Sequence, residues 1–199
     1  SQIERITMLQ QLERQRAAGL LALRDALTGL PNRRAFDDAV EAGIARAASD
    51  SHALALIFAD VDHFKSVNDH FGHDIGDAVL RLVATRLSRA VGDAGVVFRL
   101  GGEEMVTLLP NTDGKAALSI AERLRQAVRA DILTYETGLD DCHIDLPPDL
   151  HITASFGVAV YPTDAANAAE LLKRADTAMY HAKRTGRDRV SAARAGDDQ

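Results

Sequence analysis

The chain contains 199 residues, of which 46% are hydrophobic and 26% are charged, a composition typical of a soluble globular protein that buries a core without disulfide or metal crosslinks. The single cysteine, Cys142, excludes an internal disulfide framework and a cysteine-rich zinc site, and it favours a reducing, cytoplasmic location. The net charge of −6 argues against nucleic acid as a partner, and no apolar run is long enough to span a bilayer, so we expect no membrane contact in this segment.

Residues 1–24 differ from the rest of the chain, because they contain many strong helix formers, no proline and a single glycine. Their apolar residues fall into two heptad-like registers, Ile6-Leu9-Leu20-Leu23 and Met8-Leu12-Ala22. One interpretation is a solvated helix at the point where a longer protein was cut. The other is a parallel coiled-coil stalk that holds two copies of the following domain together. We favour the stalk, which predicts a homodimer. An upstream sensor domain could shift the stalk between its two heptad registers.

Helices and strands alternate in the predicted elements that follow. A turn marked by Gly29 and Pro31 precedes a helix over about 32–48, and the continuous apolar run 53–59 predicts a strand that is buried on both faces. The other expected elements are a helix over about 75–91, a hairpin of strands 96–100 and 105–109, a helix over 114–129, an irregular acidic segment 132–150, a strand over 151–161 and a helix over 168–184. This interleaving predicts an α/β domain.

Acidic residues stand at the end of the buried strand and in the hairpin. Asp60 ends the strand, where a carboxylate can hold a hard cation such as Mg²⁺ together with substrate phosphates. Glu103 and Glu104 follow Gly101 and Gly102, and folding alone explains two adjacent like charges poorly. The turn lets both glutamates approach a metal at Asp60, and the glycines let a phosphate approach the backbone. We interpret the set as a site for metal-assisted phosphoryl or nucleotidyl transfer rather than a solvated hairpin tip.

Cations that could bind phosphates lie near these acids in the sequence. Lys65 is expected on the loop that follows Asp60, where successive backbone N–H groups can form an anion-binding nest. Lys183 and Arg187 stand at the end of the last predicted helix. Either of the latter two, taken singly, is also explained as a cation that complements the helix dipole.

Two polar residues between these acids could recognise a base. The amide of Asn68 and the carboxylate of Asp77 can together read the N–H edge of guanine, although each alone is also consistent with a helix cap or a surface acid. His63, His70 and His73 crowd the same segment, but no cysteine or zinc-binding spacing accompanies them. We interpret these histidines as surface or core residues.

Five motifs in register resemble those of the GGDEF domain of diguanylate cyclases. Gly101-Gly-Glu-Glu-Met105 is similar to the GG(D/E)EF signature. The other four are Asp25-x-Leu-Thr-Gly-Leu-Pro-Asn-Arg-Arg34, Asp60-Val-Asp-His-Phe-Lys-Ser-Val-Asn-Asp-x-Phe-Gly-His-Asp-x-Gly-Asp77, Ala154-Ser-Phe-Gly-Val-Ala159 and Ala175-Asp-x-Ala-Met-Tyr-x-Ala-Lys-x-x-Gly-Arg187. We therefore expect a stalk at 1–24, a GGDEF domain at 25–191 and a tail at 192–199.

The resemblance implies a palm-like α/β fold around a central, largely antiparallel five-stranded sheet. It also implies that two GTP molecules are condensed into cyclic di-GMP and pyrophosphate, with one GTP bound by each domain of an antiparallel pair. The alternatives are a degenerate module that binds GTP or a partner without turnover, and a cyclase that uses a different base. The retained glutamates favour turnover, and Asp77 favours guanine.

The resemblance also implies a role for each matching residue. Asp60, the Val61 carbonyl and Glu103 would hold Mg²⁺ (or Mn²⁺), Glu104 would complete the site, and one of the two glutamates would help to deprotonate the attacking 3′-hydroxyl. Asn68 and Asp77 would pair with the guanine edge, with His73 nearby. The β- and γ-phosphates would be held by backbone N–H groups at His63 and Phe64 and by Lys65, Lys183 and Arg187.

The chain departs from the family pattern at two places. Met105 stands where the signature has phenylalanine, on an apolar strand where methionine is a suitable packing substitute. The product-inhibition motif RxxD, which normally precedes the signature, is replaced by Gly92-Asp93-Ala94-Gly95, and Arg89 and Asp93 have the wrong spacing. We therefore expect activity to survive and feedback inhibition through that motif to be absent.

Overall fold

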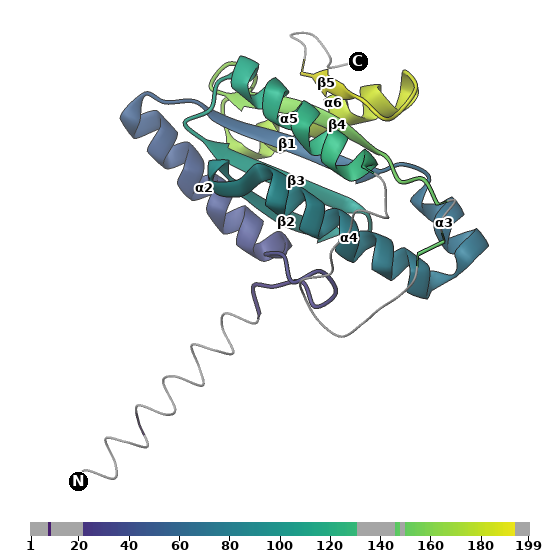
Figure 1. Ribbon diagram of the computed structural model, residues 1–199. Coiled ribbons are helices and arrows are strands. Elements are labelled where there is room, and N and C mark those ends of the chain that lie inside the picture. Colours follow the sequence, from purple (N-terminus) through teal and green to yellow (C-terminus); the bar gives the residue numbers. More distant parts are fainter. Residues whose placement is uncertain (1–7, 9–21, 131–145, 148–149, 194–199) are drawn as a thin grey trace.

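The computed structural model describes residues 8, 22–130, 146–147 and 150–193. Its elements are α2 (Arg33–Asp50), β1 (Leu54–Val61), α3 (Phe64–Phe71), α4 (His73–Val91), η1 (Gly92–Ala94), β2 (Val96–Gly101), β3 (Glu104–Pro110), α5 (Gly114–Arg129), β4 (Ala154–Tyr161), α6 (Ala168–Arg184) and β5 (Val190–Ala192). The strands form one sheet in the order β2-β3-β1-β4-β5 (Figure 1). All neighbours are antiparallel except β4 and β5, which confirms the predicted α/β fold with a largely antiparallel five-stranded sheet.

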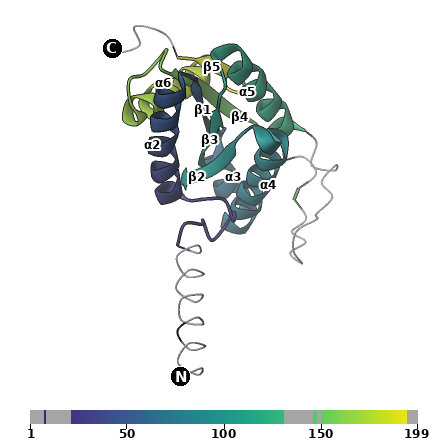
Figure 2. The same ribbon diagram turned by 90° about the vertical axis from the view of Figure 1, so that its left-hand side faces the viewer.

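Helices cover both faces of the sheet. Figure 2 shows α2 and α6 on one side and α4 and α5 on the other. The residues of β1 alternate between the two cores: Ala55, Ile57 and Ala59 pack with α4 and α5, whereas Leu56 and Phe58 pack with α2 and α6. Because β1 is central and every one of its residues is buried, its continuous apolar sequence is explained by contacts on both faces.

Side-chain caps fix where three of the helices begin. Asn32, Asp113 and Asn167 each accept a hydrogen bond from a backbone N–H in the first turn of the helix that follows. Such caps satisfy amides that have no partner within the helix. The predicted helices 114–129 and 168–184 are confirmed residue for residue, and the helix predicted at 32–48 extends to Asp50.

The prediction was wrong for the segment that follows Asp60. Lys65 was expected on a loop, but residues 64–71 form the helix α3. The apolar spacing of Phe64, Val67 and Phe71 is that of a helix face, and Gly72, with a φ of 85°, separates α3 from α4. The strand expected at 151–161 begins only at Ala154.

Several predictions fall on residues outside the part of the chain described here. They concern most of the stalk (1–7 and 9–21), most of the acidic segment 132–150 including Cys142, and the tail from residue 194. Within the described residues, no helix is long and apolar enough to cross a membrane.

The helix α6 lies very close to β4. A Cβ atom added to Gly157 would lie 2.0 Å from the Ala175 carbonyl oxygen and 2.2 Å from the Met179 backbone nitrogen. The absence of a side chain at Gly157 therefore lets the backbone of α6 approach the strand. This contact places the C-terminal end of α6, which contains Lys183, beside the end of β1.

Candidate active site

The three predicted acids gather at one end of the sheet. Asp60, near the end of β1, is directly paired with Glu104, the first residue of β3. Glu103 lies in the turn between β2 and β3. Asp60 is buried, with 6% of its surface exposed, whereas Glu103 is half-buried and Glu104 is exposed. Strand pairing therefore brings together carboxylates that are more than forty residues apart in the sequence.

The turn that contains Glu103 depends on its glycines. Gly101 has a φ of 152° and Gly102 a φ of 51°, while an added Cβ at either would meet no atom within 4 Å. Glycine is favoured here for its backbone conformation and not for lack of space. The pairing of β2 with β3 also shifts register between Arg99 and Gly101, as in a β-bulge, which redirects the side chains that follow.

Arg99 holds this turn against the segment that precedes α2. Its Nε and Nη2 donate to the Gly102 carbonyl oxygen at 3.0 and 2.8 Å, and its Nη1 donates to Asp25 Oδ1 at 2.8 Å. Asp25 also accepts hydrogen bonds from the backbone N–H and the hydroxyl of Thr28. Burial alone would raise the pKa of Asp25, but hydrogen bonds from Thr28 and Arg99 hold it below its ordinary value.

Replacing Arg99 with alanine is expected to lower the free energy of unfolding by about 2–3 kcal/mol, because the Asp25 carboxylate and the Gly102 carbonyl lose charge-assisted donors in a half-buried place. The pKa of Asp25 in the folded protein lies below its unfolded value of 3.8. The stabilisation of the fold by the ionised Asp25 carboxylate is therefore complete above pH 3.8 and is lost as the pH falls through the folded pKa. Urea unfolding measures the difference. Arg33→Ala, which removes an exposed pair with Asp37, should change stability by less than about 1 kcal/mol, and an equal loss in both variants would contradict the assignment.

The carboxylates are short of compensating positive charge. Burial raises the pKa of Asp60 to about 6, Lys183 opposes this rise, and the charges of Glu103 and Glu104 add to it. The pKa of Glu104 is also raised, first by burial and then by the charges of Asp176 and Glu103. Lys183 Nζ lies 2.5 Å from Asp60 Oδ1, an oxygen that accepts no well-formed hydrogen bond.

The donor set fits a hard divalent cation. Among the described residues, no group of three or more histidine, cysteine, aspartate or glutamate side chains is arranged to hold a metal ion by itself. Mg²⁺ does not need such a cluster, because it is usually held by one or two carboxylates together with substrate phosphates. The buried Asp60 oxygen already has a cation, the Lys183 ammonium, as its neighbour. Asp60, the Val61 carbonyl, Glu103 and Glu104 are therefore oxygen donors of the right chemistry at one place.

The helix α3 begins where phosphate binding was predicted. His63 is the residue before α3 and has a φ of 56°, and Phe64 is the first helical residue. The first amides of a helix have no acceptor within it and attract anions. Lys65 is exposed in the first turn of α3, so its predicted place on a loop was wrong, although it remains beside these amides.

The predicted guanine-binding residues lie where α3 contacts α4. A Cβ atom added to Gly76 of α4 would lie 1.9 Å from Asn68 Oδ1, so the Asn68 amide lies directly against the turn of α4 that continues into Asp77. His73 is the first residue of α4 and is exposed. The glycine therefore leaves room for the Asn68 side chain.

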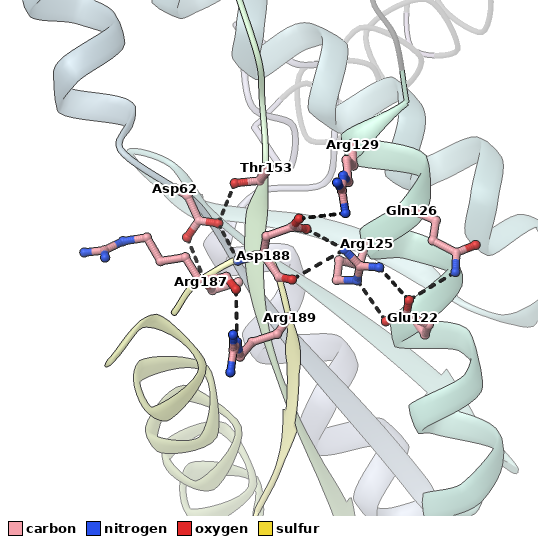
Figure 3. A network of polar contacts seen from close by, with 10 residues as sticks. Asp62, Glu122, Arg125, Gln126, Arg129, Thr153, Arg187, Asp188 and Arg189 are labelled. Carbon is pink, nitrogen blue, oxygen red and sulfur yellow. Dashed lines mark hydrogen bonds and ion pairs between the residues drawn. The ribbon is translucent and has the colours of Figure 1, made fainter. Parts of the chain in front are cut away.

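Asp62 belongs to a polar network that the sequence did not reveal (Figure 3). It is buried, with 5% of its surface exposed. It accepts hydrogen bonds from Ser155 Oγ at 2.7 Å, Thr153 Oγ1 at 2.8 Å and the Asp188 backbone N–H at 3.0 Å. Its partners are 91–126 residues away in the sequence, so no local pattern could identify them.

Comparisons with known proteins identify the family of the chain. The family model for the diguanylate cyclase GGDEF domain matches residues 22–189. Diguanylate cyclase DgcP of Pseudomonas aeruginosa is 41% identical over 172 residues, covering 86% of this chain and 24% of that protein. The response regulator PleD of Caulobacter vibrioides is 39% identical over 170 residues, covering 85% of this chain and 36% of its own.

A solved structure gives the same result for the fold. The coiled coil and GGDEF domain of DgcB from Caulobacter crescentus, in complex with c-di-GMP, superimposes with a TM-score of 0.82 at 31% identity and covers 96% of both chains. The chain belongs to the GGDEF family of diguanylate cyclase domains. It spans between about a quarter and a third of the length of DgcP and PleD.

Proposed function

We propose that this chain condenses two GTP molecules into cyclic di-GMP and releases pyrophosphate. The observation that carries the proposal is the group of Asp60, Glu103 and Glu104 at one end of the sheet, with Lys183 as its cationic neighbour. A buried carboxylate with a raised pKa beside further acids is costly for folding and is typical of a functional site. Membership of the family supports the choice of reaction.

The proposed mechanism assigns each group a task in positioning or charge stabilisation. Asn68 and Asp77 orient the guanine, while the first amides of α3, Lys65 and Arg187 hold the β- and γ-phosphates. The 3′-hydroxyl oxygen of one GTP attacks the α-phosphorus of the other, its proton passes to a carboxylate, and pyrophosphate leaves. Two such attacks close the ring.

The same acidic residues are assigned two roles, binding of the divalent metal and general-base catalysis. Asp60, the Val61 carbonyl, Glu103 and Glu104 would hold Mg²⁺ or Mn²⁺, which when bound stabilises negative charge on the phosphates. Either Glu103 or Glu104 could accept the proton of the attacking 3′-hydroxyl. Lys183, when it is not paired with Asp60, is available to the phosphates.

The decisive experiment is incubation with GTP and Mg²⁺ followed by separation of the nucleotides. We expect cyclic di-GMP and pyrophosphate, with a specific activity that rises with protein concentration because two domains must meet. GTP binding without product at high protein concentration would favour the degenerate module instead. Competition between GTP and ATP decides which base the site accepts.

Dimerisation through the N-terminal helix is part of the proposal. A chain that begins at Leu23 should lose activity at low protein concentration and regain it at high concentration, because removing a tether lowers the effective concentration of the partner. Sedimentation velocity and activity are measured over the same range. Equal activity of both chains at every concentration would contradict a tethering role. We also propose that a sensor domain lies upstream, that the protein is cytoplasmic, and that product inhibition through residues Gly92–Gly95 is absent.

Gly76→Ala is expected to weaken GTP binding about tenfold without unfolding the protein, because the new Cβ displaces the Asn68 amide and a hydrogen bond to the base is lost. The fold should survive, since the displaced atom is the tip of a side chain and alanine is favoured in helices. Calorimetric titration with GTP measures the affinity. Gly114→Ala in α5, where the added Cβ meets only Val160 at 3.8 Å, should bind GTP as the wild type does. Unchanged binding by Gly76→Ala would remove Asn68 from the guanine site.

A further inference from the structure

The segment that follows α6 holds Arg187 in an unfavourable backbone conformation. Arg187 and Asp188 have φ angles of 59° and 43°, in a region that residues with side chains rarely adopt. Two such residues in succession persist only where the surrounding structure fixes them. Arg187 is itself exposed, and its side chain extends away from the neighbouring network in Figure 3. The Arg187 backbone N–H donates to the Ala182 carbonyl at 3.0 Å, which holds the segment against the end of α6, and the contacts on its other sides come from Asp188.

Asp188 provides these contacts on two sides. Its carboxylate accepts from Arg125 at 2.6 Å and pairs with Arg129 at 3.2 Å, both on α5. Its backbone N–H donates to Asp62 Oδ2 at 3.0 Å. The latter bond is on the active-site side, because Asp62 directly follows Val61 and precedes His63 at the start of α3.

Asp62 is itself fixed in place. Its backbone N–H donates to the Thr153 carbonyl at 2.9 Å, and its carboxylate accepts from the Thr153 and Ser155 hydroxyls. Both oxygens of a buried carboxylate are thus satisfied by donors from the β4 region and by one amide from the segment after α6. Hydrogen bonds through Asp62 therefore connect the end of β1 to the backbone beside Arg187.

We propose that Asp62 is a positioning residue that sets the place of the Arg187 guanidinium relative to the carboxylates on β1 and β3. The inference rests on the proposed function, in which Arg187 contacts the β- and γ-phosphates. Both carboxylate oxygens of Asp62 already accept hydrogen bonds from the protein, so in this proposal Asp62 acts through the Asp188 amide and not on the nucleotide or the metal. A defect at Asp62 should therefore affect recognition of the triphosphate and leave recognition of guanine unchanged.

The test compares binding of two nucleotides in the presence of Mg²⁺. The first is the α,β-methylene analogue of GTP, which cannot be cleaved between the α- and β-phosphates, and the second is GMP, which lacks the outer phosphates. Asp62→Ala should weaken binding of the analogue about tenfold or more and leave GMP affinity unchanged. Asp62→Asn should restore most of the loss, since its side-chain oxygen can still accept from Asp188 while its amide donates to the Ser155 hydroxyl.

Two further variants separate positioning from simple destabilisation. Ser155→Ala removes a different donor from the same carboxylate and should leave the affinity for the analogue unchanged, even if stability falls. Arg187→Ala should reproduce the loss seen in Asp62→Ala, and the double variant should be no weaker than either single one, because both changes remove one interaction. Equal weakening of both nucleotides, multiplying losses in the double variant, or unchanged binding by Asp62→Ala would each overturn the proposal.

Failure of the proposed function gives a different result. If the wild type binds neither nucleotide and forms no cyclic di-GMP, the proposed function and this inference both fall. If the wild type is active while Asp62→Ala binds the analogue normally, only the inference falls. Should Asp62→Ala not fold, amide hydrogen exchange of Asp188 in the wild type decides: we expect slow exchange that the analogue slows further and GMP does not, and rapid exchange would overturn the proposal.

Discussion

Asp60→Asn is expected to lower the rate of cyclic di-GMP formation by about a thousandfold or more while leaving the protein at least as stable as the wild type. The activity falls because the amide cannot replace a charged oxygen donor, and a catalytic metal contributes several kcal/mol of charge stabilisation. The stability does not fall because burial of the Asp60 charge is unfavourable, as its pKa of about 6 indicates. Activity is measured with GTP and Mg²⁺, and stability by thermal unfolding without divalent cations.

The stability difference between Asp60→Asn and the wild type should depend on pH in a defined direction. The folded pKa of Asp60 is raised from 3.8 to about 6, so between these values the folded state binds more protons than the unfolded state. The stabilisation that the wild type gains from the protonated Asp60 carboxyl is therefore present below pH 4 and is lost as the pH rises towards 6. The asparagine variant lacks this loss and should be more stable above pH 6 by about 1–2 kcal/mol. This estimate includes the loss of the ion pair between Lys183 and Asp60.

Asp113→Asn is the matched control for this prediction. It makes the same chemical change at the cap of α5, outside the proposed site, where asparagine and aspartate cap equally well. Neither activity nor stability should change. An Asp60→Asn variant with wild-type activity would remove Asp60 from the metal site, and one that is less stable than the wild type at pH 7 would contradict the electrostatic account.

Gly157→Ala is expected to destabilise the fold by about 3 kcal/mol or more. The new Cβ would lie 2.0 Å from the Ala175 oxygen, 2.2 Å from the Met179 nitrogen and 2.9 Å from the Ala178 carbonyl carbon. All three atoms belong to the backbone of α6, so relief requires the helix to move away from β4, which costs more than a side-chain adjustment. Activity should fall with stability, because α6 places Lys183 beside Asp60.

Urea unfolding measures the effect, with Gly114→Ala as the control. That substitution adds the same methyl group in an ordinary van der Waals contact and should stabilise the protein by about 0.4–1 kcal/mol through the unfolded chain. Equal midpoints for the two variants would show that α6 can shift freely on the sheet.

Local signals in the sequence were enough to predict most elements. The apolar run of β1 and the Gly29 and Pro31 turn before α2 are short-range features, and each acts within a few residues of its own position. The helix α3 was missed because its eight residues are followed at once by Gly72 and a second helix. Its apolar positions were too few to outweigh the expectation of a loop after a strand.

The residues of the candidate site likewise fall into those that local sequence signals indicated and those that they did not. Glu103 and Glu104 became candidates because folding alone explains two adjacent like charges poorly, and they drew attention to Asp60, which alone would be explained as a polar residue that ends a strand. Asp62 and Arg99 were missed because their roles depend on partners 126 and 74 residues away. A single sequence contains no pattern that joins such distant positions, so these contacts required the structure.

Direct pairing of Asp60 with Glu104 across β1 and β3 makes the spacing of the acids a property of the backbone ladder. Substitutions in the interior can therefore accumulate without altering that spacing, and Met105, buried opposite Ala59, illustrates this tolerance. Insertions and deletions are different, because moving either strand by one residue would exchange its two faces and separate the carboxylates. Evolution and engineering can thus vary the composition of these strands widely, whereas their length between the paired acids and the hairpin is constrained.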